Sequence, residues 1–425
     1  MGKRKHLIIG CGTAGLSAAE EIRSINDQDE IKVVTFEDYL PYSPTVLPYL
    51  LSGKIDEAHL PMKRENYFDA LKATLARSAE ITGIMPESKE ALYKGGGRET
   101  YDTLLIATGA EPIRPPIKGL YESGYNAFHT IEDCRKLLSQ LSDDTQVAIL
   151  GGGLVGMEVA IGMVERRGCR VTIIEREPRL LPLYFDDEAA SLIASVFLNH
   201  DVHLFTGKEV VEVSKEKGTV AISFSDGNAI EAQLLVTCTG VKPRIGFLQG
   251  SGISVNHGIL VDRKMMTSVK DIYAAGDVAE GRDYFTGRHG MNQIIESAVD
   301  EGRVAGSNMA GLDDEYEGWI SSNIFHFFGH TAFSAGLSLP DDNGYQVLSK
   351  KEDKKPQFKK LVFDGNRLVG AMFINIKLDP GLILYLIRNE VDLSSYKEML
   401  FEQPKETSRW LMMETEHRSS ASIQG

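Results

Sequence analysis

Hydrophobic positions near the amino terminus follow the order of a strand, a turn, a helix and a second strand. An apolar run ends at closely spaced glycines, an amphipathic segment follows, and a second apolar run comes after it. This first unit predicts its four elements at residues 6–9, 10–15, 16–25 and 31–36. About 140 residues further on the order returns, with elements predicted at residues 147–150, 151–156, 157–164 and 171–174. Two copies of one βαβ unit predict two domains built alike.

The rest of the pattern predicts two crossings between these domains and a third domain. Apolar strands predicted at 101–107 and 234–238 both end in Thr-Gly, and the prolines that follow exclude a helix or a central strand. After about residue 320, short strands and turns precede a helix over 381–388. We therefore expect an α/β fold with two Rossmann-like nucleotide-binding domains and a C-terminal α+β interface domain. The domains are predicted at 1–111 with 245–318, at 112–244, and at 319–425, with a polar tail or partner arm from Lys405.

The first glycine turn has the spacing of a dinucleotide site. Gly10 permits the tight turn, Gly12 lets the backbone approach a diphosphate, and Gly15 lets the helix pack on the strand. Glu37 ends the second predicted strand, where a carboxylate can accept both ribose hydroxyls and would repel a phosphorylated ribose. The alternative is that these glycines serve packing alone.

A remote segment is expected to complete this site. Residues 271–278 predict a strand that runs into a Gly-Asp turn. Asp277 either holds a ribityl hydroxyl of FAD or is an ordinary turn residue. A helix predicted over 292–306 would direct its N-terminal dipole at negative charge on a reduced flavin.

The second glycine turn repeats this arrangement at Gly151, Gly153 and Gly156. Glu175 ends the next predicted strand and again favours an unphosphorylated ribose, so NADH is favoured over NADPH, although the neighbouring Arg176 leaves that preference open. Glu158 is expected in the first turn of the helix. It either complements the helix dipole or faces the nicotinamide.

Composition narrows the class of protein. With 425 residues, 42% of them hydrophobic, the chain is long enough for two or three domains, and its formal charge of −14 would repel nucleic acid. No apolar stretch reaches the ~18 residues that span a bilayer, and the amino terminus, although it imitates a secretory signal, fits a strand and glycine turn better. We expect a cytoplasmic protein that binds neither nucleic acid nor a membrane.

The possible metal ligands do not form a recognisable site. The four cysteines share no CxxC spacing, which excludes a zinc ribbon, an iron–sulfur cluster of the chain's own and a local redox dithiol. His326 and His330 lie four residues apart, but no third ligand is placed, and a packed aromatic segment is the favoured interpretation. No metal is expected.

Five motifs occur in the order found in the glutathione reductase-like family of pyridine nucleotide-disulfide oxidoreductases. They are GCGTAG with Glu37, YDTLLIATGA, GGGLVGME with VTIIERE, LLVTCTGVKP and IYAAGDVAE. The resemblance covers nearly the whole chain and implies an FAD domain, an NAD domain and an interface domain. It implies FAD contacts at Gly10, Gly12, Thr13, Ala14, Gly15, Glu37, Pro44, Thr108, Gly109 and Asp277. It implies NAD contacts at Gly151, Gly153, Leu154, Val155, Gly156, Glu158, Glu175 and Gly240.

The chain departs from this family at the redox cysteine. Thr45 stands where the CoA-disulfide reductase and NADH oxidase branch carries that cysteine. A hydroxyl cannot cycle through disulfide, sulfenate or thiolate, so disulfide or peroxide reduction by this residue is excluded. The lysine that some relatives pair with a glutamate near the flavin is also missing, which leaves the role of Glu158 open and the catalytic residues unassigned.

Without a thiol relay, electrons must leave the flavin directly. This resembles NADH:rubredoxin reductases, the flavoprotein half of nitrite reductase, and the FAD-bearing subunit of NADH-dependent 2-oxoacid dehydrogenases of the phenylglyoxylate type. The resemblance implies a subunit that transfers electrons between an iron–sulfur partner subunit, or a ferredoxin-like protein, and NAD+ in a hetero-oligomeric complex. The alternatives are a freestanding NADH:rubredoxin or ferredoxin reductase, and a flavin-bound regulatory protein that senses NADH.

Overall fold

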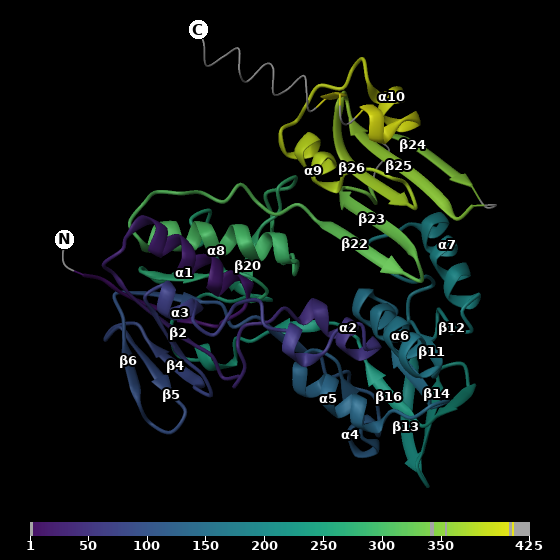
Figure 1. Cartoon of the computed structure of the whole chain (residues 1–425), viewed down its shortest axis with the longest axis horizontal. Coiled ribbons are helices and arrows are strands. Elements are labelled where there is room, and N and C mark those ends of the chain that lie inside the picture. Colours follow the sequence, from purple (N-terminus) through teal and green to yellow (C-terminus); the bar gives the residue numbers. More distant parts are fainter. Residues whose placement is uncertain (1–2, 341–343, 353–354, 408–409, 412–425) are drawn as a thin grey trace. The chain divides into compact units, whose positions relative to one another are not determined.

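The computed structural model describes residues 3–340, 344–352, 355–407 and 410–411. The chain divides into two compact units, and Figure 1 labels some of the elements of each. Unit 1 consists of Met1–Pro115, His129–Leu138 and Thr239–Ile320. Unit 2 consists of Pro116–Phe128, Ser139–Cys238 and Ser321–Gly425. The boundaries predicted between an FAD, an NAD and a C-terminal domain stay predictions.

Unit 1 is built on a five-stranded parallel sheet with the strand order β19-β7-β1-β2-β3. Its strands are β1 (Lys5–Ile9), β2 (Glu30–Val34), β3 (Ala73–Ala76), β7 (Thr103–Ile106) and β19 (Ile272–Ala274). β1 and β7 consist almost entirely of buried residues, as expected for central parallel strands covered on both faces. The chain runs through β1, α1 (Thr13–Ile25) and β2 in the predicted βαβ order.

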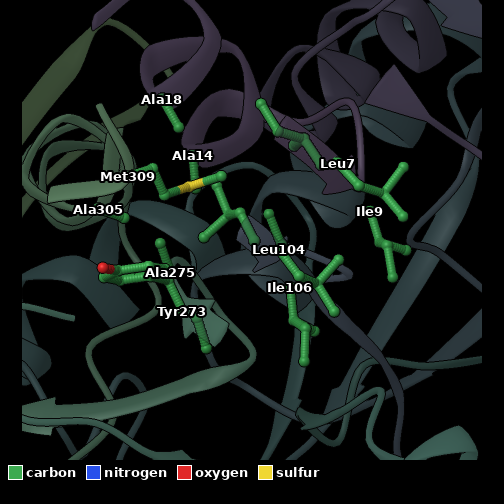
Figure 2. Packing of buried hydrophobic residues seen from close by; sticks show 14 of the residues in the cluster. Leu7, Ile9, Ala14, Ala18, Leu104, Ile106, Tyr273, Ala275, Ala305 and Met309 are labelled. Carbon is green, nitrogen blue, oxygen red and sulfur yellow. The ribbon is translucent and has the colours of Figure 1, made fainter. Parts of the chain in front are cut away.

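Helices α1 and α8 (Ile295–Met309) pack closely because small residues face each other. A Cβ atom on Gly302 would lie 2.3 Å from the carbonyl oxygen of Ala14, and one on Gly306 would lie 2.6 Å from that of Ala18. Side chains larger than hydrogen would therefore force the two backbones apart. Figure 2 shows apolar side chains from α1, α8, β1, β7 and the end of β19 meeting in the core of this unit.

Smaller elements complete unit 1. An antiparallel sheet of β4, β5 and β6 lies between β3 and β7 in the chain. The proline-rich crossing predicted after residue 110 pairs β8 with β17 in a two-stranded sheet. The remaining elements are η1 (Pro44–Val46), α2 (Leu47–Ser52), η2 (Glu57–His59), α3 (Tyr67–Ala70), β4 (Ile81–Met85), β5 (Glu90–Tyr93), β6 (Arg98–Thr100), β8 (Ala110–Pro112), most of α5 (Ile131–Gln140), β17 (Val241–Pro243), η3 (Gly246–Leu248), β18 (Ile259–Leu260), β20 (Ala279–Arg282) and β21 (His289–Gly290).

A buried histidine ties the first strand of this sheet to its neighbours. His6 lies 2.7 Å through Nδ1 from Thr103 Oγ1 and 3.1 Å through Nε2 from Asp29 Oδ2. Burial lowers the pKa of His6 despite the bond to Asp29. Burial would raise the pKa of Asp29, but hydrogen bonds from Arg4 N and His6 outweigh it and hold that pKa below its usual range. Because both pKa values are lower in the folded chain than in the unfolded chain, protonation of either group favours the unfolded chain.

We expect acid to destabilise unit 1 through this pair. The unfolded chain protonates His6 below pH ~6.5 while the folded chain resists, so stability is present above that pH and falls by up to ~1.4 kcal/mol per pH unit below it. Urea midpoints measured from pH 7.5 to 5 should fall less steeply in His6→Gln than in the parent protein. His59→Gln is the control, because His59 is an exposed histidine whose side chain also contacts an aspartate, Asp56. Equal slopes in all three proteins would contradict the prediction.

Unit 2 repeats the first sheet. Its parallel strands have the order β12-β11-β10-β16-β9, in which β10, β11, β12 and β16 correspond to β1, β2, β3 and β7. An antiparallel sheet of β13, β14 and β15 again lies between the third and fourth of these strands in the chain. The elements are α4 (Leu120–Ser123), β9 (Asn126–Ala127), β10 (Gln146–Leu150), α6 (Leu154–Arg167), β11 (Arg170–Ile174), α7 (Asp187–Leu198), β12 (His203–Phe205), β13 (Val210–Glu216), β14 (Thr219–Phe224), β15 (Ala229–Ala232) and β16 (Leu234–Thr237).

The C-terminal part of unit 2 is an antiparallel sheet with helices. Its strand order is β22-β23-β26-β25-β24, and β25 and β26 form the hairpin predicted at Asp364–Gly365. The elements are β22 (Ser322–Phe327), β23 (His330–Gly336), β24 (Gln346–Glu352), β25 (Gln357–Asp364), β26 (Arg367–Ile374), α9 (Pro380–Arg388) and α10 (Lys397–Glu402). The predicted fold class, two Rossmann-like domains and a C-terminal α+β domain, is confirmed.

The predicted helix starts are wrong by three residues in both βαβ units. α1 begins at Thr13 and α6 at Leu154, so the third glycine of each turn already lies in the helix. Each helix begins directly after an extended glycine, because the tight turn is complete at that point. Most of the tail predicted from Lys405 lies outside the described residues.

Candidate functional site

The glycine turn between β1 and α1 is closed by backbone contacts that exclude side chains. Gly10 has a φ of +116°, and a Cβ there would lie 1.9 Å from the carbonyl oxygen of Ala107. A Cβ on Gly15 would lie 2.1 Å from the carbonyl oxygen of Gly10. The N–H of Gly10 donates to the carbonyl of Val34 at 2.8 Å, which ties the turn to β2. These two glycines are required by the fold itself.

The turn between β10 and α6 repeats this geometry in unit 2. Gly151 has a φ of +111° and donates to the carbonyl of Ile174 at 2.8 Å. A Cβ on Gly156 would lie 2.0 Å from the carbonyl oxygen of Gly151. In both turns the first glycine has a positive φ and the third glycine packs against the carbonyl of the first, so a side chain at the third position is excluded.

The middle glycines differ from these, because open space lies in front of them. Gly12 and Gly153 have extended backbones, with φ and ψ of −80° and −171° and of −79° and −179°, and a Cβ on either would meet no atom within 4 Å. Each is the N-cap of its helix, and neither offers a side chain to the first amides. In contrast, Asp186 at the N-cap of α7 accepts from Ala189 N. The amides of α1 and α6 can therefore bind an anion that sits over the glycine.

The residues after the middle glycines lie in the helices and not in the turns where they were predicted. Thr13 and Ala14 are the first two residues of α1, and Leu154 and Val155 are the first two residues of α6. Their amides belong to the orphan donors of each helix N-terminus.

Glu37 lies beyond the end of β2 and is held by a tyrosine. Tyr42 donates its hydroxyl to Glu37 Oε1 at 2.9 Å and accepts from the N–H of Ile131 at 3.1 Å. Burial raises the pKa of Glu37, although the Tyr42 hydrogen bond opposes this. The carboxylate keeps lone pairs for ribose hydroxyls, as its predicted role requires.

Glu175 holds the backbone of the second turn. Its oxygens accept from the N–H of Gly152 at 2.7 Å and from the N–H of Glu177 at 2.8 Å. Each carboxylate oxygen has a further lone pair, so the group can also accept from a ribose hydroxyl. Glu175 thereby places a negative charge beside the turn, where a phosphorylated ribose would be repelled.

The crossing residues of unit 1 form a compact cluster. Thr108 Oγ1 donates to the carbonyl of Arg244 at 3.1 Å, and Arg244 N donates to the carbonyl of Gly109 at 3.0 Å. The Arg244 guanidinium stacks on the Phe36 ring, 4.8 Å from its centre. Gly240 also belongs to unit 1, where its carbonyl accepts from Ile113 N at 2.9 Å, and its assignment to NAD stays a prediction.

Asp277 lies in the turn between β19 and β20 that was predicted to complete the FAD site. Burial raises the pKa of Asp277 to about 6. Its carboxyl group has no hydrogen-bond or ion-pair partner within the described part of the chain. Asp277 is partly exposed, so its carboxylate oxygens are open to a hydroxyl of a bound ligand. This favours the ribityl interpretation over an ordinary turn residue.

Glu158 does not lie in the first turn of its helix, contrary to the prediction. α6 begins at Leu154, so Glu158 is its fifth residue. The helix dipole acts mainly over the first turn, which weakens the dipole interpretation. Burial raises the pKa of Glu158 to about 7, so this carboxyl can hold or release a proton near neutral pH.

Thr45 is the residue predicted at the position of the family's redox cysteine. It is exposed in η1, after Pro44, and its hydroxyl lies 2.8 Å from that of Ser43. Burial raises the pKa of both Cys11 and Cys238 to about 12, so these thiols stay protonated, and Cys134 and Cys169 are buried too. Protonated, buried thiols are poor nucleophiles.

We expect Thr45→Val to leave electron transfer from NADH to a dye within about twofold of the parent, the scale of a typical surface substitution. The reason is that the Thr45 hydroxyl, which is hydrogen-bonded to the Ser43 hydroxyl, cannot be oxidised and reduced as a cysteine thiol can. Steady-state NADH:ferricyanide turnover tests this, with Ser43→Ala as the control for loss of the hydroxyl pair. A tenfold loss in Thr45→Val alone would show that the hydroxyl takes part in the reaction.

The two histidines considered as metal ligands lie in the packed aromatic segment. His326 Nδ1 lies 3.0 Å from Thr331 Oγ1, and His330 Nδ1 lies 2.9 Å from Asn375 Nδ2. Phe325 and Phe327 of the same segment are buried and stack with Phe197 of α7.

Two residues of the first site were missed at the level of sequence. Tyr42 holds Glu37, and Glu301 of α8 accepts from the N–H of Gly276 at 2.8 Å, next to Asp277. A tyrosine five positions after the ribose carboxylate, and a glutamate next to a glycine on an otherwise small helix face, are the signals that could have indicated them.

These residues fit two dinucleotides. Each turn has an open place over an uncapped helix N-terminus for a diphosphate, and each has a carboxylate at the end of the second strand for a ribose. Asp277 adds an acceptor for a ribityl hydroxyl in unit 1. The assignment of FAD to unit 1 and of NAD to unit 2 stays a prediction.

Comparison with known proteins agrees with this geometry. Residues 4–302 match the family model described as pyridine nucleotide-disulphide oxidoreductase. The chain belongs to this family. Residues 322–391 match the rubredoxin NAD+ reductase C-terminal domain.

Individual relatives of this oxidoreductase are named for different reactions. The chain is 35% identical over 415 residues to the NADH-dependent phenylglyoxylate dehydrogenase subunit epsilon of Aromatoleum evansii, covering 97% of this chain and 98% of the relative. It is 28% identical to the nitrite reductase [NAD(P)H] of Bacillus subtilis, over 95% of this chain but about half, 49%, of that protein. The structure of an NAD-dependent persulfide reductase from A. fulgidus superposes with a TM-score of 0.82 at 26% identity, covering 91% of this chain and 77% of that one.

The chain is thus an NAD(H)-dependent flavoprotein oxidoreductase that uses FAD and transfers electrons. None of the helices in its described residues is both long and apolar enough to cross a membrane.

Proposed function

We propose that this chain is the FAD- and NAD-binding subunit that transfers electrons between iron–sulfur partner subunits and NAD+ in a 2-oxoacid dehydrogenase complex of the phenylglyoxylate type. Residues 1–111 and 245–318 would bind FAD, 112–244 would bind NAD, and 319–425 would form the interface domain. Bound FAD supplies the exchange between one-electron carriers and two-electron nicotinamide chemistry.

The observation that carries this proposal is Thr45 at the position of the redox cysteine. An exposed threonine and four protonated or buried cysteines offer no thiol relay. Electrons would therefore pass directly between the flavin and an external carrier. The similarity to the epsilon subunit extends over nearly the full length of both chains, which supports a subunit of the same kind.

The other residues would bind and orient the nucleotides. The amides after Gly12 and Gly153 would hold the two diphosphates, Glu37 and Glu175 the riboses, and Asp277 the ribityl chain. Glu158 would hold or release a proton near neutral pH in unit 2.

The test is to purify a tagged chain from its native host. We expect co-purifying subunits that contain iron and acid-labile sulfide, and NAD+ reduction by the complex when phenylglyoxylate or another 2-oxoacid is supplied. A chain that purifies alone and reduces rubredoxin or ferredoxin with NADH would support a freestanding reductase, which the match to the rubredoxin NAD+ reductase C-terminal domain favours. Fast flavin bleaching by NADH without reoxidation by any carrier would support the regulatory alternative.

A further inference from the structure

Unit 1 contains a buried glutamate that no motif accounts for. Glu301 lies in the middle of α8, is 3% exposed, and accepts a hydrogen bond through Oε2 from the N–H of Gly276 at 2.8 Å. Its other oxygen, Oε1, faces Gly281 of β20, 3.6 Å from where a Cβ of that glycine would be. Glu301 therefore holds the backbone of the turn that presents Asp277.

The two charged side chains that act most strongly on Glu301 are both negative. Asp277 in the held turn and Asp300 on the same helix both act on it with like charge. On the facing helix α1, the uncharged Ala14 and Ala18 lie against Gly302 and Gly306 of α8. The acidic residue Glu21 lies further along α1 and accepts a hydrogen bond from Ser307 of α8. β7, which also packs on α8, has no titratable side chain in its sequence TLLI. Neither Glu301 nor Asp277 forms an ion pair within the described residues.

Two neighbouring carboxyl groups of which one is buried repel each other when both are ionised, which raises the cost of ionising the second. Asp277 is partly exposed while Glu301 is enclosed, so Asp277 ionises first. Burial raises the pKa of Glu301 to about 8 and the neighbouring aspartates add to this, although the hydrogen bond from Gly276 N opposes it; the pKa of Asp277 is raised to about 6. We therefore expect the pair to hold one proton at neutral pH, on Glu301.

We propose that Glu301 is a positioning residue of the FAD site, and that its hydrogen bond from Gly276 N holds the Gly276–Asp277 turn so that Asp277 can accept a ribityl hydroxyl. This inference rests on the assignment of Asp277 to FAD and is independent of the electron acceptor. A second negative charge on Glu301 repels Asp277 and loosens the turn. FAD affinity is then full below the pKa of Glu301 in the free protein and declines as the pH rises above it.

The experiment measures the FAD dissociation constant of the apoprotein by flavin fluorescence between pH 6.5 and 9.5. We expect the constant to rise about tenfold per pH unit at most above pH ~8 in the parent protein. Glu301→Gln keeps an acceptor for Gly276 N and cannot ionise, so its FAD affinity should match the parent at pH 7 and stay constant with pH. Glu301→Leu removes the acceptor and should weaken FAD at every pH.

The outcomes distinguish the role of Glu301 from the assignment of Asp277 to the FAD site. A pH profile of Glu301→Gln identical to the parent, or weak FAD binding by Glu301→Gln at every pH, would overturn it. Should the variants fail to fold, calorimetry of the parent apoprotein in two buffers of different ionisation enthalpy still tests it, because FAD binding near pH 8.5 should take up a fraction of a proton. No proton uptake would overturn the proposal. Asp277→Asn tests the underlying assignment, since unchanged FAD affinity there would remove Asp277 from the site.

Discussion

A Gly12→Val variant should purify as a folded but colourless protein. The extended backbone of Gly12 suits a β-branched residue, and a Cβ there meets no atom within 4 Å, so the fold should tolerate the change. The added side chain would occupy the place predicted for the FAD diphosphate and prevent its hydrogen bonds to the first amides of α1. Two lost charge-assisted hydrogen bonds of ~1.5–3 kcal/mol each correspond to a loss of roughly 10²- to 10⁴-fold in FAD affinity.

The measurement is the flavin absorbance of the purified variant together with its circular dichroism and thermal midpoint. Gly246→Ala is the control, because Gly246 also faces open space but lies outside both turns. A yellow Gly12→Val protein with the parent's FAD content would show that the diphosphate lies elsewhere. An unfolded protein would contradict the steric argument, whereas Gly10→Val and Gly15→Val are expected to disrupt the fold.

The glycine turns could be predicted because their spacing encodes local sterics. Gly10 and Gly15 each meet a backbone carbonyl that the β-turn-α geometry places there, so glycine at those positions reports the turn directly. The start of α1 could not be predicted, because the three glycines resemble a loop until the backbone of Gly12 is seen to be an extended N-cap. The same error at α6 placed Glu158 in the first turn of the helix. With the observed start at Leu154, Glu158 is the fifth helical residue, which weakens the dipole interpretation.

Contacts between distant segments could not be predicted. Glu301 reaches the Asp277 turn only because Gly302 lets α8 approach the carbonyl of Ala14, and these residues are far apart in the sequence. In the C-terminal part, the alternation of Phe325 and Phe327 with His326 predicts a buried aromatic face, but not its partner Phe197 from α7. Sequence periodicity indicates that a face is buried and does not indicate what covers it.

A Gly153→Val variant should bind FAD normally but lose its reaction with NADH. Gly153 has nearly the backbone conformation of Gly12 and the same open space, but it lies in unit 2 at the start of α6. Its new side chain would block the NAD diphosphate and leave the FAD turn of unit 1 unchanged. By the same hydrogen-bond loss, kcat/KM for NADH should fall roughly 10²- to 10⁴-fold.

Stopped-flow mixing with NADH measures this as slow or absent bleaching of a flavin that dithionite still reduces at once. Gly12→Val and Gly153→Val are thus matched controls for each other, because the same substitution in the same local geometry should abolish two different functions. Loss of FAD from Gly153→Val would contradict the assignment of separate nucleotides to the two turns. Normal NADH reduction by the variant would mean that the turn before α6 does not bind the diphosphate, and that the open space before it has another role.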